Sequence, residues 1–176
     1  MSDFDRDTWQ TPNWLYFWLD SIYGFNLDAA ASDKFHWCAQ YFTKANSALT
    51  QDWGGEGTVA FCNPPYSRGM KEAFVNKAIE QRKKGVTTVM LIPALPSEGW
   101  FPNNAANHIM FISEGRVNFI NPLTQKEVTG VPAGSCICVF DAKSLSSRTN
   151  ITFVERDIIK AAGNSVIKQK SLGEAA

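Results

Sequence analysis

The hydrophobic pattern of the chain is most regular in its central third. Two apolar runs, 58–62 and 86–93, are typical of strands buried in a sheet, and the second is continuous enough to be covered on both faces. Between them, residues 69–84 repeat apolar side chains at helical spacing, and Gly85 ends the segment. A strand, a helix and a strand in this order predict two parallel strands joined by a right-handed crossover.

The segment upstream of this unit predicts a short amphipathic helix over 11–24. Thr11 is a typical N-cap, Pro12 suits the first helical position, and Gly24 provides a left-handed stop. A short strand over 25–28 follows and ends in an acid. Residues 33–51 carry few regular signals, and we expect an irregular segment there with one short helix or edge strand.

The C-terminal half predicts further strands at one side of the sheet. Residues 108–112 form one strand, and 116–120 with 135–140 are expected to form an antiparallel pair. A weak strand or helix follows at 151–159, and the polar tail 168–176 is expected to fray.

Length and composition fit a single domain over residues 1–176, with a core from about 7 to 160. The chain has 176 residues, 44% of them hydrophobic, which is enough for a proper core. The order of elements predicts an α/β fold with a mostly parallel central sheet, an antiparallel edge and flanking helices. The polar, acidic N-terminus and the lack of a long apolar run predict a cytoplasmic protein.

Charge and cysteine usage narrow the possible partners. Lys plus Arg and Asp plus Glu both number 17, so any binding to nucleic acid must come from local patches rather than a global basic field. The four cysteines are Cys38, Cys62, Cys136 and Cys138, with no C-x-x-C pair among them. Because Cys136 and Cys138 alternate with apolar residues, they are typical of small core side chains, and we expect neither disulfides nor a metal site.

The most informative stretch is Asn63-Pro64-Pro65-Tyr66, which directly follows the apolar run 58–62. Two prolines cannot donate ladder hydrogen bonds, so the strand must stop at Asn63 and enter a stiff turn. The Asn63 side-chain carbonyl and the Pro64 backbone carbonyl could accept hydrogen bonds from one planar NH2 group. The Tyr66 ring could stack on the heterocycle that carries this amine, an interaction worth about 1–3 kcal/mol.

Three further residues each have a structural and a functional interpretation. Asp28 ends a strand, where it could meet a ligand or form an Asx turn. Asp52 precedes a glycine-rich turn and could face a pocket, although a turn cap is slightly favoured. Trp9 precedes the helix cap, where the segment alone favours a hydrophobic staple over a pocket wall.

A few polar and aromatic residues could contact a larger substrate. Ser67 and Arg68 follow the proline turn, and Lys71 lies one helical turn further on, so these residues are candidate substrate contacts. Trp100 lies in a loop at the same sheet edge and could close over a ligand. The remaining lysines and arginines of 69–84 are more typical of a solvated helix face.

Taken together, the motifs resemble those of one enzyme family. Trp9-Gln10-Thr11-Pro12, Leu27-Asp28-Ala29-Ala30, Tyr41-Phe42-Thr43, Asp52-Trp53 and the Asn-Pro-Pro-Tyr stretch occur in the order found in small phage-type DNA N6-adenine methyltransferases, the Dam-like family. The similarity covers about residues 7–140. The glycine-rich loop common among methyltransferases is replaced here by the small residues 29–32.

This resemblance implies a Rossmann-like methyltransferase domain that uses S-adenosylmethionine and acts on DNA. It implies catalytic roles for Asn63, Pro64, Pro65 and Tyr66. It also implies cofactor contacts by a second set of residues: Trp9, Thr11, Pro12, Asp28, Ala29, Ala30 and Asp52.

Two other functions remain open from the sequence. The same proline turn serves enzymes that methylate cytosine N4 or a protein glutamine amide. A non-catalytic nucleic-acid-binding protein that retains the fold is the third possibility. The leading hypothesis is adenine N6 methylation, with the target base flipped out of the duplex.

Overall fold

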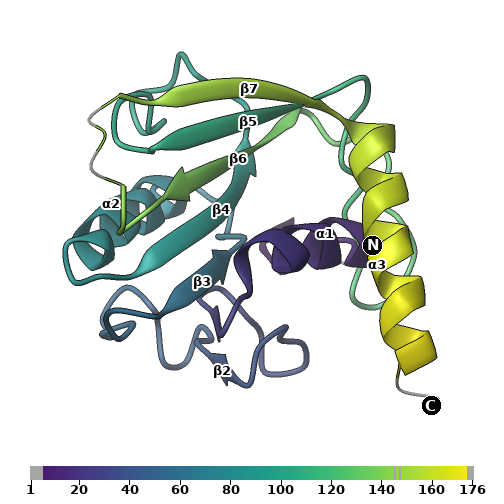
Figure 1. Cartoon of the computed structure of the whole chain (residues 1–176), viewed down its shortest axis with the longest axis horizontal. Helices are drawn as coiled ribbons and strands as arrows, with labels where there is room; N and C mark the ends of the chain where they lie inside the picture. Colours follow the sequence, from purple (N-terminus) through teal and green to yellow (C-terminus); the bar gives the residue numbers. More distant parts are fainter. Residues whose placement is uncertain (1–5, 145, 147, 174–176) are drawn as a thin grey trace.

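The chain forms one seven-stranded sheet with helices packed against it (Figure 1). The computed structural model describes residues 6–144, 146 and 148–173. The sheet order is β2-β1-β3-β4-β6-β5-β7. In chain order the elements are a short 3-10 helix η1 (Arg6–Thr8), α1 (Asn13–Tyr23), β1 (Leu27–Asp28), β2 (Gln40–Tyr41), β3 (Val59–Cys62), α2 (Met70–Arg82), β4 (Thr87–Pro93), β5 (His108–Ser113), β6 (Ser135–Phe140), β7 (Asn150–Glu155) and α3 (Arg156–Gly173).

The strand pairing confirms the predicted fold class. β2, β1, β3 and β4 are mutually parallel, and β5 is parallel to β7. Antiparallel pairing is confined to β6, which lies between β4 and β5. The β3–α2–β4 unit is the predicted parallel crossover, so the carboxyl ends of β1, β3 and β4 meet at one edge of the sheet.

Each face of the sheet has its own hydrophobic core. Side chains of β4 alternate between them, as its continuous apolar run predicts: Met90 and Ile92 pack with α2, whereas Val89 and Leu91 pack with α1. All four are fully buried. The proline turn that begins at Asn63 leaves β3 between these two cores, so both cores fix its position.

The start of α1 differs from the prediction in one detail. The N-cap is Pro12, in an extended conformation, and Thr11 makes no cap hydrogen bond. The Pro12 backbone carbonyl accepts the first hydrogen bonds of the helix, from the Leu15 and Tyr16 amides at 3.0 and 3.2 Å. The buried Thr11 hydroxyl therefore does not serve as the helix cap. Gly24 ends the helix with φ +65°, as predicted.

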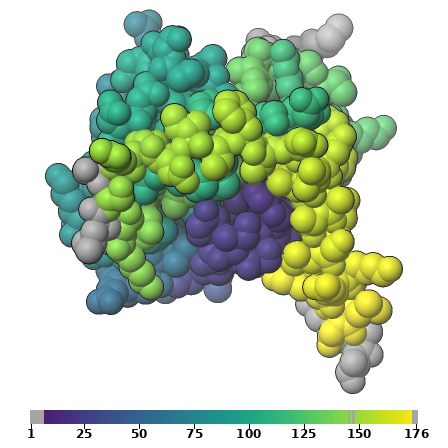
Figure 2. Space-filling view, turned by 45° about the horizontal axis from the view of Figure 1, so that its top comes forward, coloured from purple at the N-terminus to yellow at the C-terminus, as the bar shows by residue number. Residues whose placement is uncertain are grey.

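The expected frayed tail is wrong for residues 168–173, which belong to α3. Helix α3 packs closely along α1, and Figure 2 shows the yellow helix against the purple N-terminal segment. The contact depends on Gly163, since a Cβ there would lie 1.9 Å from the Trp14 carbonyl oxygen. The segment 151–159, predicted as a weak strand or helix, contains both: nearly all of β7 and the first turn of α3. Residues 174–176 lie outside the described part of the chain.

The predicted strand 116–120 is also wrong. β6 pairs with β4 and β5, whereas Ile120 makes only isolated bridges, to Gln10 and Glu127. Glu114 at φ 56° and Gly115 at φ 143° turn the chain away from the sheet after β5. The apolar residues of this segment, such as Phe119, are therefore buried against the α1 face and not in a ladder.

No helix in residues 6–144, 146 or 148–173 is both long and apolar enough to cross a membrane.

Candidate active site

The proline turn begins where β3 ends, as the sequence predicts. β3 stops at Cys62, and Asn63 follows at the carboxyl edge of the sheet. The side-chain amide nitrogen of Asn63, Nδ2, donates to the Trp9 backbone carbonyl oxygen over 3.4 Å. Because the nitrogen is oriented by Trp9, the side-chain oxygen is the atom that remains to accept a hydrogen bond from a ligand.

A cavity of about 520 Å³ opens beside Asn63 at this edge. Its walls come from the segment before α1, the residues after β1, the irregular segment after β2 and the proline turn. Ligands of open α/β sheets bind at this position, outside the carboxyl ends of the strands. Among the predicted site residues, those that line the cavity are Trp9, Thr11, Asp28, Ala29, Ala30, Asn63, Pro65 and Ser67.

Asp28 is buried at the end of β1, with 3% of its surface exposed. Its two carboxylate oxygens accept hydrogen bonds from the Ala30 amide at 3.2 Å and the Trp37 amide at 3.0 Å. Burial raises the pKa of Asp28 above its ordinary value, and these two amides and the nearby His36 lower it only in part. The Asx turn and the pocket position, which the sequence offers as alternatives, therefore occur together: Asp28 shapes the cavity wall that it also lines.

Two residues that line the cavity each have a buried polar atom without a hydrogen-bond partner among the described residues. These atoms are Trp9 Nε1 and the Thr11 hydroxyl oxygen. A buried polar group without a partner costs about 1–3 kcal/mol, so a small side-chain movement that let a ligand pair with either atom would be favourable. Trp9 also stacks on Phe119, with ring centroids 6.0 Å apart. Trp9 thus lines the cavity and also packs against the hydrophobic core on the α1 face.

Tyr66 lies beside the cavity rather than in its lining. Its hydroxyl donates to the Leu91 carbonyl oxygen of β4 over 3.3 Å, and its ring meets the edge of Phe119 at 5.9 Å. Burial raises the pKa of Tyr66 well above its usual value, so the phenol stays protonated at neutral pH. The ring is half-buried, held by its hydroxyl at one end.

The loop 63–67 is held by charged residues on both sides. The Ser67 amide donates to the Asp7 carboxylate at 2.9 Å. On the other side, the Lys71 ammonium donates to the backbone carbonyls of Tyr66 and Ser67 and lies 5.5 Å from the centre of the Trp100 ring. Lys71 and Trp100 therefore lie together behind the loop, outside the cavity lining.

Arg68, Pro12 and Pro64 are further predicted site residues outside the cavity lining, and Pro64 is buried within the proline turn. Arg68 is exposed beyond the proline turn, where a large substrate can reach it. Pro12 is buried at the start of α1, where it fixes the direction of the segment that carries Trp9 and Thr11.

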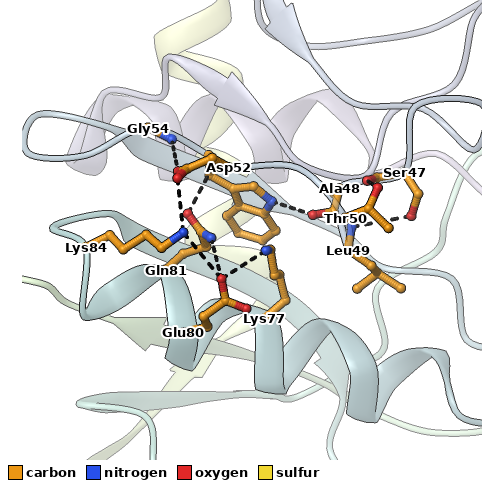
Figure 3. A network of polar contacts seen from close by, with 11 residues as sticks. Ser47, Ala48, Leu49, Thr50, Asp52, Gly54, Lys77, Glu80, Gln81 and Lys84 are labelled. Carbon is orange, nitrogen blue, oxygen red and sulfur yellow. Dashed lines mark hydrogen bonds and ion pairs between the residues drawn. The ribbon is translucent and has the colours of Figure 1, made fainter.

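Asp52 is the predicted cofactor residue that the structure places elsewhere. It is exposed, accepts a hydrogen bond from the Gly54 amide and pairs with Lys84 at 3.0 Å (Figure 3). The turn interpretation of Asp52 is therefore correct. In the same network Lys77, predicted on the solvated face of α2, is only 8% exposed and pairs with Glu80.

This network still supports the cavity indirectly. Gln81 of α2 is fully buried and accepts a hydrogen bond from the Trp53 amide. The Trp53 indole nitrogen donates to the Ala48 carbonyl oxygen at 2.9 Å, and Ala48 lines the cavity. Asp52 thus belongs to the scaffold behind the wall.

Sequence reasoning missed several residues at the site. Asp7 was part of a polar N-terminus without an assigned role, although its carboxylate binds the catalytic-loop candidate. Phe119 was assigned to a strand, but it contacts both Trp9 and Tyr66. The aromatic side chains of Phe35 and Phe42, in the segment with few regular signals, also line the cavity. Such a segment gives no sequence pattern from which a cavity wall could be predicted.

The fold and the site together define an open α/β protein with a cavity at the carboxyl ends of parallel strands and an oriented side-chain amide at its rim. The family model for DNA N-6-adenine-methyltransferase (Dam) matches residues 1–166. The chain belongs to this family.

Two relatives show the same similarity. A DNA N-6-adenine-methyltransferase of Escherichia phage T1 is 35% identical over 154 residues, which cover 78% of this chain and 63% of the relative. A DNA N-6-adenine-methyltransferase of Haemophilus phage HP1 is 29% identical over 164 residues, covering 90% of this chain and 92% of the relative. The matched part of this chain thus spans less than two thirds of the phage T1 protein but nearly all of the phage HP1 protein.

Proposed function

We propose that this chain transfers a methyl group from S-adenosylmethionine to N6 of adenine in DNA, acting in the cytoplasm of a host cell. The observation that carries the proposal is the oriented Asn63 amide at the rim of a cavity with two unpartnered polar groups. Membership in the Dam family gives this geometry its chemical meaning.

The residues of the cavity suit S-adenosylmethionine, which brings a methyl group already activated by a sulfonium. Asp7, Asp28 and Asp33 line the cavity and provide the negative charge that a sulfonium and an ammonium group require. Phe35 and Phe42 provide apolar aromatic walls for a heterocycle. Trp9 Nε1 and the Thr11 hydroxyl supply the hydrogen-bond donors that a carboxylate or a ring nitrogen would accept.

The methyl acceptor would be oriented by the proline turn. An adenine amine is flat because its lone pair is delocalised into the ring. Hydrogen bonds from the amine to the Asn63 side-chain oxygen and the Pro64 carbonyl would favour a tetrahedral nitrogen and stabilise its developing positive charge. A base inside a duplex cannot reach this position, so it must be extruded at a cost of a few kcal/mol, which contact with Tyr66 would partly offset.

The proposal requires no strong base at the loop. Burial raises the pKa of Cys62 as well as that of Tyr66, so neither is ionised at neutral pH. The methylated nitrogen is acidic enough to lose its proton to water after transfer. Most of the rate enhancement would come from positioning, because the electrophile is already activated.

The first test is the chemical identity of the product. DNA incubated with the protein and S-adenosylmethionine, digested to nucleosides and analysed by mass spectrometry, should contain N6-methyladenine. N4-methylcytosine, or a methylated glutamine in a protein substrate, would instead support the alternative acceptors that the same loop can serve. A chain that does not bind S-adenosylmethionine in calorimetry would be a non-catalytic relative.

The second test is Asn63→Ala. Loss of one preorganised acceptor should lower turnover by about 10²–10³ and leave cofactor affinity nearly unchanged. Asn164→Ala is the matched control, since Asn164 is exposed on α3. If Asn63→Ala kept more than about a third of wild-type turnover, the loss would be far smaller than expected, and Asn63 would not be the acceptor.

A further inference from the structure

A small ordered hairpin over residues 118–128 projects from the α1 face beside α3 (Figure 1). The Val128 amide donates to the Phe119 carbonyl at 2.7 Å, and the Asn121 amide donates to the Lys126 carbonyl at 2.9 Å. The Asn121 side chain accepts hydrogen bonds from the amides of Leu123 and Thr124 at 2.8 and 3.2 Å. The tip is therefore held in one conformation by its own hydrogen bonds.

The base of this hairpin is joined to the candidate active site. Gln10 and Ile120 exchange two backbone hydrogen bonds, both at 2.9 Å, directly beside Trp9. Phe119 stacks on Trp9 on one side and lies perpendicular to the Tyr66 ring on the other. The hairpin base is therefore in contact with both Trp9 and the proline turn.

The tip presents an apolar side chain to solvent. Leu123 is 78% exposed, the highest value among the large apolar side chains that the structure describes. Its neighbours Thr124, Gln125 and Lys126 are exposed and polar. Four extended residues from Phe119 to Leu123 span at most about 13 Å, so the tip can reach only a few base-pair steps from a base held at Tyr66.

We propose that hairpin 118–128 is the DNA-contacting element of this chain, with Leu123 pressed into the base stack next to the target adenine. This inference rests on the proposed function. Insertion of a leucine between base steps unstacks them, which is the work that base extrusion requires. Lys126, next to the tip, is placed to contact a phosphate.

The charges of the hairpin allow a phosphate contact. The cavity lining carries three carboxylates, of Asp7, Asp28 and Asp33, against the single ammonium of Lys44, so a phosphate backbone is disfavoured there. On the hairpin, Glu127 accepts a hydrogen bond from Asn118 at 3.0 Å and its charge is paired with Lys160 of α3 at 3.8 Å. The exposed Lys126 can therefore meet a phosphate, as can the exposed Arg68 beyond the proline turn.

Site-specific cross-linking can place the tip on DNA directly. All four native cysteines are buried, so a maleimide photo-cross-linker should react selectively with Leu123→Cys. The control is Leu172→Cys, since Leu172 is 63% exposed near the end of α3. With a duplex substrate and a non-reactive cofactor analogue, the Leu123→Cys conjugate should cross-link about tenfold more than the control and near the target adenine. Equal yields from the two conjugates would overturn the proposal.

Kinetics of Leu123→Ala then test the wedge role. The Michaelis constant for duplex DNA should rise about tenfold while that for S-adenosylmethionine is unchanged, and an abasic site opposite the target should restore binding because extrusion then costs less. Leu172→Ala should match the wild type in both constants. A normal DNA Michaelis constant in Leu123→Ala would refute the wedge. If the wild type made no methyladenine, the proposed function itself would fail; an active wild type without tip cross-links refutes the hairpin alone.

Discussion

Asp28→Asn separates the functional role of this carboxylate from its structural role. The substitution removes the charge but keeps the shape and one acceptor oxygen. The substitution has two opposing effects on stability. It destabilises the fold because the new side-chain NH2 group faces one of the two backbone N–H donors and cannot accept its hydrogen bond. It stabilises the fold because a charge no longer has to be buried. Since the pKa of Asp28 is raised despite both hydrogen bonds, desolvation is the larger effect. We expect the unfolding free energy to change by less than about 1 kcal/mol.

The effect of Asp28→Asn on cofactor binding should be much larger. A hydrogen bond between charged groups contributes about 1.5–3 kcal/mol, so loss of the carboxylate should weaken S-adenosylmethionine binding by about 10- to 150-fold in calorimetry. Asp52→Asn is the matched control, because Asp52 carries the same charge outside the cavity, and its cofactor affinity should equal that of the wild type.

The pH dependence gives a second signature of Asp28. Its pKa in the folded protein lies above the ordinary 3.8, so between these two values the folded chain binds more protons than the unfolded chain. As the pH falls through this window, the wild type should gain stability relative to Asp28→Asn while losing cofactor affinity. If Asp28→Asn instead bound the cofactor within about threefold of the wild type at neutral pH, the carboxylate would have no direct part in recognition.

Three further substitutions test the support of the site. Gly163→Ala should lower the unfolding free energy by about 3 kcal/mol in urea denaturation, because its Cβ would collide with a carbonyl of α1. Gly173→Ala is the control and should be neutral, since the space around Gly173 is open. Equal effects of the two substitutions would show that the close approach of α3 is unimportant. Lys71→Met should lower kcat about tenfold and leave cofactor affinity intact, because it removes the hydrogen bonds to two loop carbonyls. Lys83→Met, at the other end of α2, is the control. An unchanged kcat in Lys71→Met would contradict the positioning role. Tyr66→Phe should keep most of the activity in a methylation assay and Tyr66→Ala should lose most of it, because the ring is retained only in the first; a reversed order would assign the role to the hydroxyl.

The central unit of the fold was predictable because its signals are local. The run 86–93 is apolar without interruption, and β4 is buried on both faces. Gly24 ends α1 in the left-handed conformation that only glycine adopts freely. Asn63 follows β3 directly because two prolines forbid further pairing, so the position of this candidate site residue could be predicted from sequence.

The errors arise where tertiary contacts override local preference. The segment 116–120 alternates like a strand, but its apolar side chains bury against α1 after Gly115 redirects the chain. The tail 168–173 is polar, yet it continues a helix that packs on α1, and its Lys170 pairs with Asp20 of α1 at 3.0 Å. Asp52 is close in sequence to β3 but pairs with Lys84, 32 residues further on. No single-sequence pattern reports such partners.

The site was predictable in chemistry but not in its walls. The place of Asn63 at the cavity follows from its position directly after a buried strand, and its proposed role as an acceptor follows from its residue type. The enclosure of the cavity depends instead on Asp7 meeting Ser67, 60 residues away, and on Phe119 reaching Trp9. Such long-range contacts are set by how the elements pack, which composition and periodicity do not encode.

The packing of α3 on α1 sets an order of events during synthesis. Trp14 lies directly after the segment that forms one cavity wall, yet the helix that covers it depends on Gly163, made 149 residues later. At about 5–20 residues per second, the interval between these two residues is about 7–30 s. Throughout that time α1 has an uncovered apolar face, while β1, β3 and β4 can already pair. A nascent chain would thus have made every residue that lines its ligand cavity, all of them between 7 and 74, well before the helix that covers α1, and chaperones would meet the exposed face of α1 in the meantime.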